Sequence, residues 1–248
     1  MRTIDHIAHL EREGELLADA AAEAGENAPV PTCPGWTTGD LVRHTSTFHR
    51  WAARIVAGRL PGPVPEDPMP AEPVGEALPP WFLEGHGALV RTLRAAGEDT
   101  ACWAFLPAPS PRAFWARRQA HETAVHRVDA ESARGGRLSP LDPEFAADGI
   151  DELLTGFHAR ARSRVRTGRP RVLRVRPTDA AGAWTVRLCA DAPPRTERSA
   201  GDGPADCELT GPAQDLYLVL WNRLPPDAAT VTGDTALAAL WRRTSAVT

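Results

Sequence analysis

Apolar residues recur at helical spacing through roughly the first two thirds of the chain, and this periodicity constrains the possible folds more than any other feature. Residues 3 to 24 carry one apolar stripe among charged residues, formed by Ile4, Ile7, Leu10, Leu16 and Leu17. Comparable stripes occupy residues 38 to 58, 80 to 96 and 110 to 134. Four amphipathic helices with short or looped connections predict an antiparallel four-helix bundle.

Two of these helices have clear start signals. Thr37 or Thr38 can cap the second helix, because a hydroxyl oxygen accepts from the free N–H groups of a first helical turn. Ser110 can cap the fourth helix, and Pro111 suits the first helical position. The proline-rich segment 61–80 cannot be helical throughout, so we predict a long connection there.

The pattern changes after Gly168. Residues 142–164 predict a fifth helix, but two short apolar runs between Val172 and Leu188 flank a turn at 178–182 and predict a β-hairpin. A strand at 206–210 and helices at 212–224 and 235–243 follow. We therefore predict a mainly α protein with a smaller α+β part. The helical bundle domain is expected over residues 1–165, and a small α+β C-terminal domain over residues 166–248.

Charge and composition exclude several functional classes. The net charge is −4 and all 28 basic residues are arginine, which excludes Schiff-base and P-loop lysine chemistry. A mildly acidic chain is not typical of a nucleic-acid binder, and the basic run from Arg160 to Arg176 is interpreted as a solvated helix end and strand. No apolar run approaches the ~20 residues that span a bilayer, and charged residues interrupt the N-terminus where a signal peptide would lie. We expect a cytoplasmic protein with no membrane or nucleic-acid partner.

The cysteines do not form a recognisable motif. Cys33, Cys102, Cys189 and Cys207 are too widely spaced for a zinc ribbon, a Cys-x-x-Cys redox pair or a disulfide framework. Cys33 lies near a helix N-terminus, which can lower a thiol pKa, but the Pro34-Gly35 pair that follows favours a turn role.

The segment 119–129 carries the strongest chemical signal. It resembles a zincin motif, yet His121 and His126 are five residues apart and lie about 140° apart around a helix, so they cannot share one metal. Glu122 and His126 are four residues apart and share a helix face. A carboxylate and an imidazole one turn apart are a suitable pair of metal ligands in a helix bundle.

His44 is the best candidate for a third ligand. It lies on the apolar stripe of Leu41, Phe48 and Trp51, which is expected to face inward, whereas His49 points away from that stripe. Two histidines and one carboxylate leave coordination positions open, as in catalytic rather than structural metal sites. Taken separately, His44 also fits a buried core histidine, and the pair on the other helix also fits a surface hydrogen bond.

Two segments then show a family resemblance. Thr32-Cys-Pro-Gly-Trp-Thr-Thr-Gly-Asp-Leu-Val-Arg-His44 and His121-Glu-Thr-Ala-Val-His-Arg-Val-Asp-Ala-Glu131 closely resemble the mycothiol-dependent maleylpyruvate isomerase family. The stretch Asp215-Leu-Tyr-Leu-Val-Leu-Trp-Asn-Arg-Leu-Pro225 looks like that family's second domain. The resemblance implies a DinB-like four-helix domain that binds a divalent metal, usually zinc, followed by a smaller α+β domain.

The same resemblance implies site residues and chemistry. The family's metal ligands match His44, Glu122 and His126, and a catalytic arginine of its second domain matches Arg223. The implied activity uses a metal-activated low-molecular-weight thiol, mycothiol, against a small electrophile, either as a cis-trans isomerase or as an S-transferase. Asp129 and Glu131 either orient the ligands or pair with arginines.

Two further points stay open at the level of sequence. The chain is expected to be a monomer or a small homo-oligomer. The alternative to an enzyme is a non-catalytic module of the same fold that binds a metal or a small molecule or has a regulatory role.

Overall fold

The computed structural model describes residues 1–64, 73–199 and 203–247. The chain forms two compact units, Met1–Ser139 and Pro140–Thr248. No helix among the described residues is long and apolar enough to cross a membrane.

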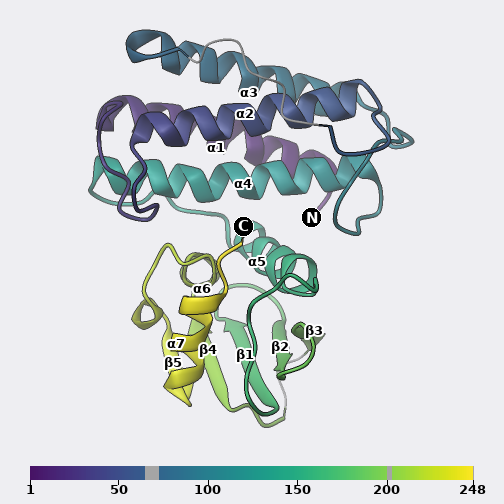
Figure 1. Ribbon diagram of the computed structural model, residues 1–248, viewed down its shortest axis with the longest axis vertical. Helices are drawn as coiled ribbons and strands as arrows, with labels where there is room; N and C mark the ends of the chain where they lie inside the picture. The colour runs from purple at the N-terminus through teal and green to yellow at the C-terminus, as the bar shows by residue number, and fades with distance from the viewer. Residues whose placement is uncertain (65–72, 200–202, 248) are drawn as a thin grey trace. The chain divides into compact units, whose positions relative to one another are not determined.

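The first unit is the predicted four-helix bundle (Figure 1). Its helices are α1 (Thr3–Ala24), α2 (Thr38–Ala57), α3 (Leu78–Ala95) and α4 (Pro111–Arg134), with a short 3-10 turn, η1 (Gly75–Ala77), before α3. The core between the helices is apolar and includes Leu10, Leu17, Leu41, Phe82 and Leu89, each fully buried. The connection predicted at 61–80 ends earlier than expected, because α3 already begins at Leu78. Residues 65–72 of this connection lie outside the described part of the chain.

Side-chain caps start the two helices that carry the candidate site. Thr37 caps α2 in a reciprocal arrangement: Asp40 N donates to Thr37 Oγ1 at 3.2 Å, and Thr37 N donates to Asp40 Oδ2 at 2.9 Å. Ser110 caps α4 by accepting from Ala113 N at 3.2 Å. These caps determine where each helix begins. The site residues His44 on α2 and Glu122 and His126 on α4 lie further along the same two helices.

A buried ion network joins α1 to α4. Arg127 donates to Glu13 and to Glu131, each at 2.7 Å, and none of the three side chains is more than 1% exposed. Arg127 also donates to the backbone oxygen of Ser139 at 3.0 Å. Such a network holds two helices in one register only if the arginine and the glutamates are all present, because removal of one partner leaves a buried charge unpaired.

The second unit combines a helical part with a five-stranded sheet (Figure 1). The elements are α5 (Pro143–Asp151), η2 (Glu152–Phe157), β1 (Arg171–Pro177), β2 (Ala183–Leu188), β3 (Arg195–Ser199), β4 (Cys207–Gly211), α6 (Ala213–Leu220), η3 (Pro226–Ala228), β5 (Thr230–Gly233) and α7 (Thr235–Thr244). The strand order is β3-β2-β1-β4-β5, with β1 and β4 parallel and the other pairs antiparallel. The predicted hairpin is confirmed as β1 and β2, and the predicted strand at 206–210 as β4.

The structure differs from the sequence prediction in the fifth helix and in the division of the chain. The α-helix ends at Asp151 and continues as a π-helical turn, whose last hydrogen bond joins His158 N to Leu153 O at 3.0 Å. The helical segment stops at Phe157. Residues 158–164 are rich in arginine and contain no large apolar side chain that would continue the buried stripe. The segment packs within the second unit, where Trp184 Nε1 donates to Asp151 Oδ1 at 2.9 Å. This places the division after Ser139 instead of after residue 165.

A buried histidine in the second unit predicts loss of stability in acid. His158 is 3% exposed and packs edge-on against Trp241, and burial lowers its pKa to about 4. A lowered pKa in the folded state means that stability is present above the unfolded pKa of 6.5 and is lost as pH falls below it. Between pH of about 7 and about 4 this histidine is expected to cost the folded state about 3 kcal/mol.

Urea unfolding of the wild type and of His158→Gln at both pH values measures this effect. The variant is expected to lose about 3 kcal/mol less than the wild type on acidification. An equal loss in the two proteins would contradict the prediction.

Candidate metal centre

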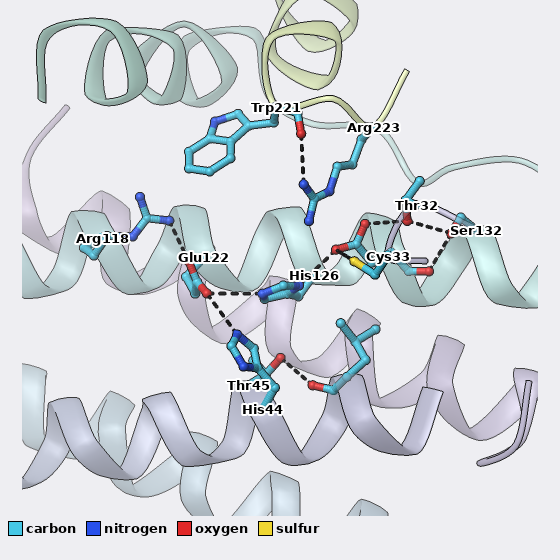
Figure 2. Close-up of polar contacts among 12 residues, drawn as sticks. Thr32, Cys33, His44, Thr45, Arg118, Glu122, His126, Ser132, Trp221 and Arg223 are labelled. Atoms are coloured by element: carbon cyan, nitrogen blue, oxygen red, sulfur yellow. Dashed lines mark hydrogen bonds and ion pairs between the residues drawn. The ribbon is translucent and has the colours of Figure 1, made fainter. Parts of the chain in front are cut away.

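Three side chains predicted as ligands meet between α2 and α4 (Figure 2). His44 comes from α2, and Glu122 and His126 come from adjacent turns of α4. One ligand atom from each lies within 4.8 Å of the other two. Glu122 Oε1 is 3.1 Å from His126 Nε2 and 3.7 Å from His44 Nε2, so the carboxylate lies between the imidazoles.

Two of the three side chains are partly exposed, and the third, His126, is buried. The exposed fraction is 29% for His44, 22% for Glu122 and 9% for His126. A structural metal site is normally closed by four protein ligands, whereas this group offers three candidate ligands, two of them partly exposed. The arrangement therefore suits a centre that also binds a small molecule.

An arginine holds the carboxylate of this group. Arg118 NH2 donates to Glu122 Oε2 at 3.0 Å from one turn earlier in α4, and the Arg118 side chain is 4% exposed. Burial alone would raise the pKa of Glu122, but the nearby imidazoles of His126 and His44 outweigh it and hold that pKa well below its usual range. Glu122 is therefore ionised at neutral pH.

The orientation of His126 is determined by a second carboxylate. His126 Nδ1 lies 2.9 Å from Asp129 Oδ2, and Nε2 on the opposite side of the ring faces Glu122 Oε1 at 3.1 Å. Burial alone would lower the pKa of His126, but hydrogen bonds to Asp129 and Glu122 outweigh it and raise the pKa to about 9. The extra proton on Nε2 must leave when a metal binds.

Aromatic rings surround His44. The ring centroid of Trp36 lies 4.8 Å from that of His44 in an edge-on contact, and the centroid of Phe48 lies 4.6 Å away. The rings of His44 and His126 are nearly perpendicular, with centroids 5.0 Å apart. These contacts restrict rotation of the His44 ring.

The remaining predicted residues have distinct surroundings. His49 is fully buried outside the ligand group, with Nε2 2.8 Å from Thr123 Oγ1. Of the two acids that could either orient ligands or pair with arginines, Asp129 contacts His126 and Glu131 pairs with Arg127. Arg118 was not among the predicted site residues, although its spacing of four residues from Glu122 indicates that the two share a helix face.

Arg223 lies in the second unit, just after α6 ends at Leu220. The preceding Asn222 has a φ of 63°, a left-handed conformation that asparagine tolerates and that stops the helix. Arg223 is half-buried, and its NH1 donates to the backbone oxygen of Trp221 at 2.9 Å. The catalytic role expected for Arg223 stays a prediction.

The donor set fits a divalent metal such as zinc. Zinc favours imidazole nitrogen and carboxylate oxygen, and catalytic zinc sites commonly use two histidines and one glutamate. The group also has the outer carboxylate that usually accompanies a ligating histidine, here Asp129 on His126 Nδ1. His44, Glu122 and His126 are thus the residues that would hold the ion.

Comparisons with known proteins extend over both units. Residues 7–131 match the family model described as the mycothiol maleylpyruvate isomerase N-terminal domain, and residues 144–245 match the C-terminal domain model of the same family. None of the curated proteins matches the chain.

Two crystal structures of the mycothiol-dependent maleylpyruvate isomerase share the fold, one of them with a histidine replaced by alanine. Each has a TM-score of 0.61 and 13% sequence identity, and each alignment covers 94% of this chain and 93% of the solved chain. Since the two family models together span nearly all of both units, the chain belongs to the mycothiol maleylpyruvate isomerase family.

Proposed function

We propose that this protein is a zinc-dependent enzyme that uses mycothiol against a small electrophilic substrate. The observation that carries the proposal is the convergence of His44, Glu122 and His126, whose ligand atoms lie within 4.8 Å of one another on a partly exposed surface. Family membership supports mycothiol as the thiol.

The metal would supply one element of the chemistry. An unperturbed thiol has a pKa near ~8.5 and is mostly protonated at neutral pH, whereas a zinc ion keeps a coordinated thiol deprotonated. The thiolate, not the thiol, is the nucleophile. A bound zinc ion would therefore make an activated thiolate available at neutral pH.

The protein side chains hold and orient this centre. Glu122 contributes a negative ligand that Arg118 keeps in place, and Asp129 keeps His126 in the tautomer that presents Nε2. Both histidines are close enough to Glu122 to bind the same ion. For Arg223 we propose that its guanidinium binds a substrate carboxylate in a bidentate manner, as the family resemblance implies.

The thiolate can lead to two products. In the isomerase reaction its sulfur adds to a cis carbon-carbon double bond of maleylpyruvate, the resulting single bond rotates, and elimination of the same sulfur gives fumarylpyruvate. In the transferase reaction the sulfur forms a bond to an electrophilic carbon and stays attached. Either a leaving group departs from that carbon with the bonding electron pair, or the sulfur adds to a double bond and the neighbouring carbon takes up a proton. The thiol is regenerated in the first reaction and consumed in the second.

A product assay distinguishes these reactions. Zinc-loaded protein is incubated with mycothiol and either maleylpyruvate or a model electrophile, and both organic product and free thiol are followed. Fumarylpyruvate with unchanged thiol identifies the isomerase, and a stable thiol adduct identifies the transferase. The control is His44→Ala. If the wild type forms no more of either product than this variant does, the enzyme proposal is contradicted, and a non-catalytic binding or regulatory module is favoured.

A further inference from the structure

The loop between α1 and α2 has a closed pattern of backbone hydrogen bonds. In residues 29–37, called here the 29–37 loop, Val30 N donates to Trp36 O, and Trp36 N donates to Cys33 O, each at 3.0 Å. Pro29 and Thr37 pair as an antiparallel bridge at the base of the loop. This pattern restrains the backbone that carries the side chains between them.

Two side chains of this loop contact Asp129 on α4. Thr32 Oγ1 donates to Asp129 Oδ1 at 2.6 Å, and Cys33 Sγ donates to Asp129 Oδ2 at 3.3 Å. The same Oδ2 atom lies 2.9 Å from His126 Nδ1 (Figure 2). The 29–37 loop is thus connected through one carboxylate to a residue of the candidate metal centre.

Asp129 depends on such donors because its side chain is fully buried. A buried carboxylate without enough hydrogen-bond donors is costly, and it relieves the cost by rotating toward other donors. Such a rotation weakens its hydrogen bond with His126. The short bond from Thr32 holds the oxygen that His126 does not use, so it restrains the rotation of the whole carboxylate.

We infer that Thr32 is a positioning residue of the metal centre, which holds Asp129 so that Asp129 orients the imidazole of His126. This inference rests on the proposed function, since it requires that His126 binds the metal. Trp36 extends the role of the 29–37 loop, because its ring packs against His44 while Thr32 acts on the other histidine. One loop therefore restrains both imidazoles.

Zinc affinity tests the inference without reliance on turnover. In Thr32→Val the hydroxyl is lost at nearly constant volume, and the zinc dissociation constant, measured by competition with a chelator, is expected to rise about tenfold. Thr32→Ser keeps a hydroxyl and is expected to recover most of the affinity. The matched control is Thr92→Val on α3, whose hydroxyl donates to Ala88 O and has no part in this network.

A double-mutant cycle shows whether Thr32 acts through Asp129. Asp129→Asn alone is expected to weaken zinc binding by about 10- to 100-fold. In that background Thr32→Val is expected to change the dissociation constant less than about twofold, because the carboxylate it positions is already gone. Additive effects would overturn the proposed route. Thermal unfolding of each metal-free variant identifies any loss of fold.

The outcomes separate this inference from the proposed function. Zinc binding that is equally weak in wild type and Glu122→Gln would refute the metal centre itself. A second outcome would overturn the positioning role alone. In it the wild type binds zinc tightly and Glu122→Gln does not, but Thr32→Val and Thr92→Val have the same zinc dissociation constant.

Discussion

Replacement of Arg127 by methionine is expected to lower the free energy of unfolding by about 3–5 kcal/mol, which is a large part of the stability of an ordinary domain. Methionine fills a similar volume, so the loss arises mainly from charge. Glu13 and Glu131 lie against Arg127 with exposed fractions of 1%, and they would remain as buried carboxylates without their cation. Urea unfolding measures the difference.

The effect has an expected pH dependence. Burial already raises the pKa of Glu13 in the wild type, and removal of the arginine raises it further, so the folded variant favours a protonated acid. A group whose folded pKa is raised adds stability at low pH and loses it as pH rises. The loss caused by Arg127→Met is therefore expected to be smaller at pH of about 5 than at pH of about 7.

Two comparisons test the physical cause. Arg94→Met removes an arginine of α3 whose partner Glu11 is 40% exposed, and it is expected to cost less than about 1 kcal/mol. The triple variant Glu13→Gln, Arg127→Met and Glu131→Gln is expected to recover much of the lost stability, because no buried charge remains. An Arg127→Met variant as stable as Arg94→Met would show that the buried network contributes little.

Glu122→Gln is expected to weaken zinc binding about 10²- to 10³-fold and to reduce thiol-dependent turnover in proportion. Structural zinc binding of about 10–16 kcal/mol is shared among about four ligands, so one ligand contributes roughly 2.5–4 kcal/mol. The substitution also leaves the buried Arg118 facing a neutral amide, which adds to the loss. Chelator competition measures affinity, and the product assay measures turnover.

The control for this prediction is Glu84→Gln on α3, because that glutamate is 77% exposed and lies outside the ligand group. Its zinc affinity is expected to equal that of the wild type. If Glu122→Gln also kept wild-type affinity, Glu122 would not be a metal ligand. If affinity fell but turnover at saturating zinc did not, the metal would not take part in the reaction.

The features that the sequence pattern predicted correctly are those that depend only on residues close together in the chain. The spacing of four residues between Glu122 and His126 places both side chains on one helix face wherever the helix lies. The caps Thr37 and Ser110 are equally local, since each accepts from an N–H group three residues away. These features were predictable because a helix relates nearby residues by one fixed rotation.

Strands were harder to predict where they lack an apolar pattern. The strands β3 and β5 were missed because the first is the polar sequence Arg195–Ser199 and the second has only four residues. Both lie at the edges of the sheet and are defined by pairing with β2 and β4. Such pairing is a long-range property, and a short polar segment carries little local preference for it.

The sequence by itself determined the four-helix bundle, the hairpin, the shared face of Glu122 and His126, and the family to which the chain belongs. Only the tertiary structure decided that His44 meets them, that Asp129 rather than Glu131 contacts His126, and that Thr32 contacts an aspartate 97 residues away. Residues on different elements are brought together by packing, and packing depends on the summed contacts of whole helices. No local rule of spacing contains that information.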